Sequence, residues 1–191
     1  ACQLKPEDAP SQLLRATCLA AYNRFDEAKV AFDMAVKYGD EGSQYYLARA
    51  RFLSGQKKYK ESLEDYDKGL KAGEETDEQL AERLLPLIEL GLNERVFKDV
   101  NTLTAHGYDG SWLYLVRGTV NATRGNYQAS IDDLEKFAAK NPKASSIHAL
   151  LAKIYMGAGN YKDTVKAATR AIESNPSDDD SRRLRGTANF C

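Results

Sequence analysis

The sequence predicts an all-α protein: an array of antiparallel helix pairs, with about five full 34-residue repeats and partial repeats at both ends. One observation is that RGTVN at residues 117–121 returns as RGTAN at residues 185–189, two periods of 34 later. A second is that steps of 34 residues from Phe25 meet an aromatic residue at every position but one, through Tyr59, Asn93, Tyr127 and Tyr161. A third is that segments 43–55 and 59–73 place apolar residues three and four positions apart, as amphipathic helices do. Self-similarity at a fixed period predicts stacked supersecondary units.

Each repeat is predicted to be a helical hairpin. Short side chains recur on the same period, because two helices can cross closely only where side chains are small; they are Ala16, Ala50, Gly118, Ala152 and Gly186, with Leu84 as the exception. We place the repeats at 9–42, 43–76, 77–110, 111–144 and 145–178. Residues 1–8 then form the end of a preceding repeat, and residues 179–191 form the first helix of a further repeat or a capping helix.

With these motifs the chain resembles the tetratricopeptide repeat family, whose 34-residue pattern joins large, small and aromatic positions to a final proline. Repeat 145–178 matches the pattern best, through Leu151, Ala152, Tyr155, Gly159, Tyr161, Ala171 and Pro176. Repeat 111–144 follows, with Tyr114, Gly118, Gly125, Tyr127 and Pro142. The resemblance implies that residues 1–191 form one right-handed superhelical solenoid.

Repeat 77–110 is the poor match. Leu84 stands where a small residue belongs, and Asn93 stands where the aromatic residue belongs. Pro86 falls inside the first helix, where proline removes an amide donor and crowds a carbonyl at a cost of about 3 kcal/mol. We therefore expect that helix to be bent or interrupted near Pro86.

Both ends of the chain continue the 34-residue period without a polar cap. The expectation is that the chain is a segment of a longer array, with self-association through uncapped ends as a possibility and a self-capped domain as the alternative. Three cysteines without a CxxC spacing favour a cytoplasmic location. The stretch ACQ at residues 1–3 also resembles the end of a lipoprotein signal, so a cell-envelope lipoprotein anchored at Cys2 is the alternative.

Arginines recur on the period, and an acidic residue follows three of them 16 positions later. The predicted pairs within one hairpin are Arg49 with Asp65, Arg83 with Asp99, and Arg117 with Asp133. In repeat 145–178 both charges are lost together, to Leu151 and Ala167. This joint loss favours structural ion pairs over a binding strip for an acidic partner.

The composition argues against several function classes. With 27 basic and 28 acidic residues the net charge is −1, which gives no field to attract nucleic acid. No stretch reaches the roughly 20 apolar residues that a membrane span needs. The two histidines lack a partner for metal or nucleophile chemistry, and the acidic runs at 74–78 and 177–181 are explained as helix caps. We expect no catalytic residue, no metal, no cofactor and no enzymatic activity.

The family resemblance implies a concave groove lined by the first helix of each hairpin, holding an extended peptide or a partner helix. Carried over by position, the partner-binding residues are Leu47, Arg51, Leu85, Ile88, Trp112, Leu115, Thr119, Lys153 and Met156. Trp112 is either an anchor in this groove or a cover for the joint between two repeats.

The predicted function is a protein–protein interaction scaffold whose partner presents an apolar peptide or helix. A structural array that stacks on itself or on neighbouring chains is the alternative. RNA binding is the third class, and it is disfavoured because only Arg51 and Lys153 supply positive charge along the groove.

Overall fold

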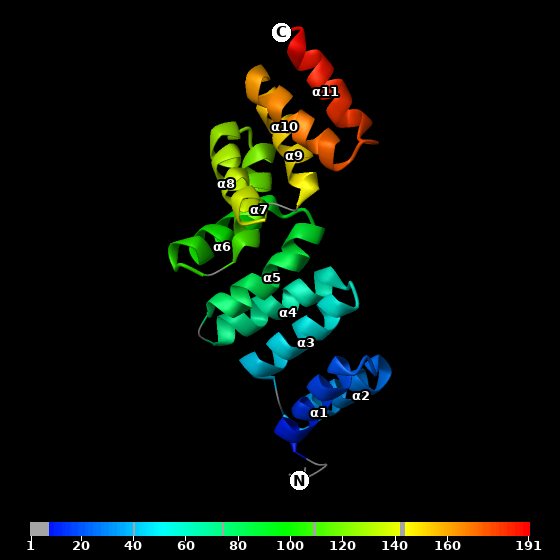
Figure 1. The fold of residues 1–191 in the computed structure, drawn as a ribbon. Coiled ribbons are helices and arrows are strands. Elements are labelled where there is room, and N and C mark those ends of the chain that lie inside the picture. Colours follow the sequence, from blue (N-terminus) through cyan, green and yellow to red (C-terminus); the bar gives the residue numbers. More distant parts are fainter. Residues whose placement is uncertain (1–7, 40, 74, 109, 142–143) are drawn as a thin grey trace. The chain divides into compact units, whose positions relative to one another are not determined.

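The structure is a computed structural model that describes residues 8–39, 41–73, 75–108, 110–141 and 144–191. Within these ranges the chain forms eleven α-helices and no strand, which confirms the all-α prediction (Figure 1). The predicted end of a preceding repeat falls mainly on residues 1–7, including Cys2, and these lie outside the described residues.

The helices alternate as first and second members of successive hairpins. The first helices are α1 (Ala9–Ala21), α3 (Ser43–Gly55), α5 (Asp77–Glu89), α7 (Ser111–Thr123), α9 (Ser145–Gly157) and α11 (Asp179–Asn189). The second helices are α2 (Phe25–Lys37), α4 (Tyr59–Ala72), α6 (Asn93–Ala105), α8 (Tyr127–Lys140) and α10 (Tyr161–Ser174). Every first helix begins 34 residues after the one before it, and so does every second helix.

The turn inside each hairpin also keeps the period. A residue with positive φ stands in each turn, at Asn23, Lys57, Gly91, Gly125 and Gly159. A left-handed residue lets the chain reverse directly after the first helix, and glycine adopts this conformation without steric cost. Lys57, at φ 60°, adopts it with a β-carbon present.

Side-chain caps begin several of the first helices. Thr76 and Gln79 form a reciprocal capping box at the start of α5. At the start of α11, the Asp178 carboxylate accepts a hydrogen bond from the backbone amide of Ser181 at 3.0 Å. The acidic runs therefore supply free backbone amides with acceptors, as the sequence predicts.

The chain divides into two compact units, Ala1–Arg95 and Val96–Cys191. The boundary falls within repeat 77–110, near the start of α6. This is the repeat in which the sequence departs most from the family pattern.

The first unit is built around aromatic residues and small residues. Phe32 lies 5.2 Å from Phe52 and 6.1 Å from Tyr45, measured between ring centroids, and all three rings are buried. Ala50 is fully buried in a second cluster, with Tyr66 and Leu47.

The core of the second unit is more aliphatic, with Leu134, Ile147 and Ile154 among its buried members. Gly118 shows why its position stays small. A β-carbon there would lie 2.8 Å from Leu134 Cγ and 3.2 Å from the Ser130 carbonyl oxygen. The close crossing of α7 and α8 therefore depends on the missing side chain.

Helix α5 runs without interruption from Asp77 to Glu89, so the predicted interruption at Pro86 is wrong. Pro86 lies in the last part of the helix, and its own carbonyl still accepts a hydrogen bond from the Leu90 amide at 3.1 Å. Its ring is fully buried. The burial of that apolar ring offsets part of the cost of the lost amide donor.

Candidate functional site

The first unit contains an open groove along its first helices. A cavity of about 880 Å³ is lined by Leu13, Leu14 and Thr17 from α1, by Gln44, Leu47, Ala48 and Arg51 from α3, and by Gln79 from α5, among others. A second cavity of about 400 Å³ adjoins it and shares Thr17, Ala48 and Arg51. We call these two cavities the first-helix groove.

Leu47 requires a correction. Its side chain is only 4% exposed, so it is not the free apolar contact that the sequence predicts. It packs against Gly69 of α4 so closely that a β-carbon on Gly69 would lie 2.7 Å from Leu47 Cγ. Leu47 forms the floor of the groove and belongs to the core.

The two predicted groove cations are both paired. Arg51 Nε lies 2.6 Å from a Glu82 carboxylate oxygen, and Lys153 Nζ lies 3.2 Å from Asp180. Each pair joins one first helix to the next, and all four side chains are substantially exposed. Exposed pairs of this kind contribute about 0–1 kcal/mol, so a partner could displace them at little cost.

The other predicted groove residues lie in varied surroundings. Leu85 and Ile88 are exposed on α5, outside the lining of the first-helix groove. In the second unit, Trp112 is 37% exposed, and its ring lies over the backbone of Gly110, where a β-carbon would meet Trp112 Nε1 at 2.7 Å. The anchor role of Trp112 stays a prediction.

Three further predicted contacts lie on α7 and α9. Leu115 is half-buried and packs against the core of the second unit. Thr119 is exposed, and its hydroxyl donates a hydrogen bond to the Leu115 carbonyl at 2.8 Å. Met156 is half-buried. Their contact with a partner also stays a prediction.

Two of the three arginine–aspartate pairs have the geometry that their spacing predicts. Arg49 donates to both carboxylate oxygens of Asp65, at 2.5 and 2.7 Å, and Arg117 donates to both oxygens of Asp133, each at 2.7 Å. The aspartate side chains are 3% and 5% exposed. These hydrogen bonds raise the pKa of both guanidinium groups.

Arg83 has partners that sequence spacing did not indicate. Its guanidinium lies 3.4 Å from Asp67 and 3.6 Å from Glu75, two carboxylates that precede it in the chain. Arg83 and Asp99 belong to different compact units, so their pairing stays a prediction.

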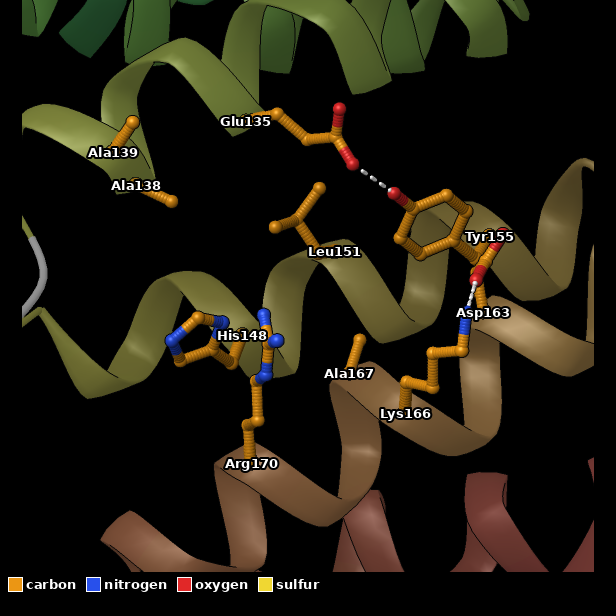
Figure 2. Close-up of a pocket in the computed structure, with 10 residues that line it drawn as sticks. All are labelled: Glu135, Ala138, Ala139, His148, Leu151, Tyr155, Asp163, Lys166, Ala167 and Arg170. Atoms are coloured by element: carbon orange, nitrogen blue, oxygen red, sulfur yellow. Dashed lines mark hydrogen bonds and ion pairs between the residues drawn. The ribbon is translucent and has the colours of Figure 1, made fainter.

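Repeat 145–178, which lacks the ion pair, has a pocket at the corresponding place. The pocket measures about 550 Å³ and lies among α8, α9 and α10 (Figure 2). Its apolar lining consists of Leu151 and Ala167 with Ala138 and Ala139, and its polar lining consists of Glu135, His148, Tyr155, Asp163, Lys166 and Arg170. The sequence analysis noted the loss of both charges at Leu151 and Ala167 but did not predict a pocket there.

Both carboxylates in the pocket lining are held by neighbouring side chains. The Tyr155 hydroxyl donates a hydrogen bond to Glu135 at 2.5 Å, and Asp163 accepts one from Lys166 at 2.8 Å (Figure 2). Asp163 also accepts a hydrogen bond from the Asn160 side-chain amide at 2.9 Å. Burial and then the bond to Glu135 raise the pKa of Tyr155, so this hydroxyl keeps its proton at neutral pH.

The opposite side of the pocket carries positive charge. Arg170 extends from α10 toward His148 (Figure 2). Burial and then the charge of Arg170 lower the pKa of His148, which is therefore neutral at pH 7. Among the described residues, no carboxylate lies within ion-pair distance of Arg170.

In the described part of the chain, no three His, Cys, Asp or Glu side chains are placed so that they could hold a metal ion together. None of its helices has the length and apolar character needed to cross a bilayer.

Comparisons with known proteins identify the fold. A family model described as tetratricopeptide repeat matches residues 115–179 and 149–190. No curated protein sequence matches the chain.

Solved structures match over most of the chain at low sequence identity. YrrB, described as a TPR protein with an unusual peptide-binding site, is 16% identical with a TM-score of 0.80, over 98% of this chain and 94% of YrrB. MamA from Desulfovibrio magneticus RS-1 is 13% identical with a TM-score of 0.74, over 92% of this chain and 99% of the MamA chain. A tetratricopeptide repeat protein from Parabacteroides merdae ATCC 43184 is 19% identical with a TM-score of 0.73, over 95% of this chain and 72% of the other.

The repeat period, the helical hairpins and these matches agree: residues 115–190 match the tetratricopeptide repeat family model, and the described chain has the fold of tetratricopeptide repeat proteins.

Proposed function

We propose that the chain is a protein-interaction scaffold that holds a partner peptide or helix in the first-helix groove. Arrays of helical hairpins generally use extended surfaces of stacked repeats to bind other proteins. The observation that carries the proposal is the 880 Å³ cavity whose lining comes from the first helices of three successive repeats, α1, α3 and α5.

The chemistry of the groove favours an apolar segment. Its walls carry Leu13 and Leu14, and Leu14 is 53% exposed. Exposed apolar surface that gathers beside a concave floor is typical of ligand-binding sites. YrrB, which shares the fold, is described as binding peptide, and this supports the same class of ligand here.

The proposal includes no enzymatic activity and no nucleic-acid ligand. It keeps the predicted cytoplasmic location, which subcellular fractionation of the source cells would test. Stacking of the chain on itself is the competing function, and light scattering at several concentrations would separate the two.

The proposal is tested by photo-crosslinking at matched positions. A photoreactive amino acid at Leu14, in the groove, should capture a partner in the source cells, whereas the same group at Val30 should not. Val30 is the control because it is aliphatic and 61% exposed on α2, outside the groove lining.

The captured partner is then produced and its affinity measured. Leu14→Asp should weaken binding by about 2 kcal/mol or more, as at an interface hot spot, and Val30→Asp should leave it unchanged. Equal crosslinking at both positions, or equal affinity of the two variants, would contradict the proposal.

A further inference from the structure

The pocket in repeat 145–178 occupies the place that the ion pair takes in repeat 43–76. Leu151 and Ala167 stand three periods after Arg49 and Asp65. In repeat 43–76, the cavity among α2, α3 and α4 measures about 290 Å³, and both Arg49 and Asp65 line it. Among α8, α9 and α10 it measures about 550 Å³. The two short apolar residues thus leave open a volume that a guanidinium and a carboxylate otherwise fill.

The flanking charges are kept although the central pair is gone. Four of the charged residues that line the cavity beside repeat 43–76 alternate in sign along the chain: Asp33 from α2, Arg49 from α3, and Asp65 and Lys68 from α4. The equivalent residues three periods later are Glu135, Leu151, Ala167 and Arg170. Glu135 and Arg170, the outer anion and the outer cation, keep the charges of Asp33 and Lys68. The two inner positions are apolar, with Leu151 in place of Arg49 and Ala167 in place of Asp65.

The two outer charges have no ionic partner in the described part of the chain. Glu135 is oriented by the hydrogen bond from Tyr155, which has no equivalent in repeat 43–76 because Leu53 stands there. Arg170 lies beside a neutral imidazole. Asp163 and Lys166, by contrast, neutralise each other at 2.8 Å.

We propose that this pocket binds a segment of a partner protein that presents a basic and an acidic side chain, and so supplies from outside the ion pair that α9 and α10 lack. The basic group faces Glu135, and the acidic group faces Arg170. Leu151 and Ala167, which are 5% and 6% exposed, form an apolar floor beneath the aliphatic parts of the ligand. A floor of this kind strengthens ion pairs, because it excludes water from one side of them.

The inference is separate from the proposed function. The pocket is lined by α8, α9 and α10, whereas the first-helix groove is lined mainly by α1 and α3. Its volume falls within the roughly 300–1,000 Å³ of small ligand sites, which suits two side chains better than a whole helix. An experiment that excludes binding at one of these two sites therefore does not exclude binding at the other.

Blocked peptides test the proposal directly. The probes carry arginine and aspartate either adjacent or separated by one or two alanines, with acetyl and amide ends, and binding to the full chain is measured by calorimetry or by chemical shift changes. At least one of them should bind, and replacing either its arginine or its aspartate by alanine should weaken binding about tenfold or more. Equal binding of the singly charged peptides, or no binding of any probe at millimolar concentration, would overturn the proposal.

Variants of the chain locate the binding. Glu135→Gln and Arg170→Gln should each weaken binding about tenfold, because a hydrogen bond between charged groups is lost. Lys162→Gln is the matched control, since Lys162 is an exposed residue of α10 outside the lining. Leu151→Arg with Ala167→Asp should abolish binding by filling the pocket with an internal pair. The assignment would be contradicted if the folded double variant Leu151→Arg, Ala167→Asp bound the peptide as well as the parent chain does. Unchanged binding in both Glu135→Gln and Arg170→Gln would contradict it too.

Discussion

Repeats 43–76 and 145–178 have the same backbone plan, but their helices are joined in different ways. In repeat 43–76, Arg49 of α3 donates two hydrogen bonds to the carboxylate of Asp65 of α4. In the second, Leu151 of α9 and Ala167 of α10 are buried at the same places, beside an open pocket. The ion pair is therefore one way to fill this position, and the hairpin does not need it.

The two repeats also differ at the turn and at the residue beside the outer cation. The left-handed turn residue is Lys57 in the first repeat and Gly159 in the second, with φ of 60° and 72°. Where the first has Tyr46, with the Lys68 ammonium 5.3 Å from the ring centroid, the second has His148 beside Arg170. Each difference predicts a measurable effect.

The largest expected effect comes from breaking the ion pair on one side. Asp65→Ala should destabilise the protein by about 3 kcal/mol, because it leaves the partly buried Arg49 without its carboxylate. Urea unfolding followed by circular dichroism measures the loss.

The matched control copies the other repeat. Arg49→Leu combined with Asp65→Ala should recover most of that stability, since a buried ion pair can often be replaced by apolar residues at little cost. If the double variant is as unstable as Asp65→Ala, the two repeats are not interchangeable at this position, and the comparison fails.

The structural features that could be predicted from the sequence are those that recur with the 34-residue period. The hairpins, the small residue at Gly118 and the Arg49–Asp65 and Arg117–Asp133 contacts all follow from equivalent places recurring in register. These features repeat because each hairpin solves the same packing problem.

Features that depend on one local environment could not be predicted in this way. Leu47 is buried because Gly69 opposite it has no side chain, and Arg83 pairs with Asp67 and Glu75 because those carboxylates are within its reach. The pocket depends on how much volume three helices leave between them, which no single spacing reports. The groove contacts at Leu85, Trp112 and Met156 depend on a partner that the chain itself does not specify.

The second prediction exchanges the turn residues. Lys57→Gly should stabilise the protein by about 0.5–1 kcal/mol, because it removes the steric cost of a left-handed lysine but adds some backbone entropy to the unfolded chain. For a chain of this size, 1 kcal/mol raises Tm by about 2–4 °C, which thermal unfolding can resolve.

The reverse exchange, Gly159→Lys, should lower the stability of the other repeat by a similar amount. Opposite signs for the two exchanges would show that the turns are equivalent. A Lys57→Gly variant that is less stable than the parent chain would mean that the Lys57 side chain makes a contribution that outweighs its backbone conformation.

The smallest expected effect is the pH dependence that His148 adds to repeat 145–178. Burial and Arg170 lower its pKa in the folded state below the value of about 6.5 expected when the chain is unfolded. The unfolded chain therefore binds more protons in the window between these two pKa values, and stability falls as the pH drops through it. From about pH 7.5 upward the contribution is constant, because the imidazole is then neutral in both states.

His148→Tyr isolates this contribution, because it installs the residue that stands at the equivalent place in repeat 43–76. The carboxylates that share the pocket are the same in both proteins, so the difference between the two stability curves belongs mainly to His148. We expect the parent chain to lose more stability than the variant between about pH 7 and pH 5. Curves that stay parallel over this range would mean that Arg170 and the surrounding apolar residues do not disfavour the charged imidazole, and that water reaches this side of the pocket freely.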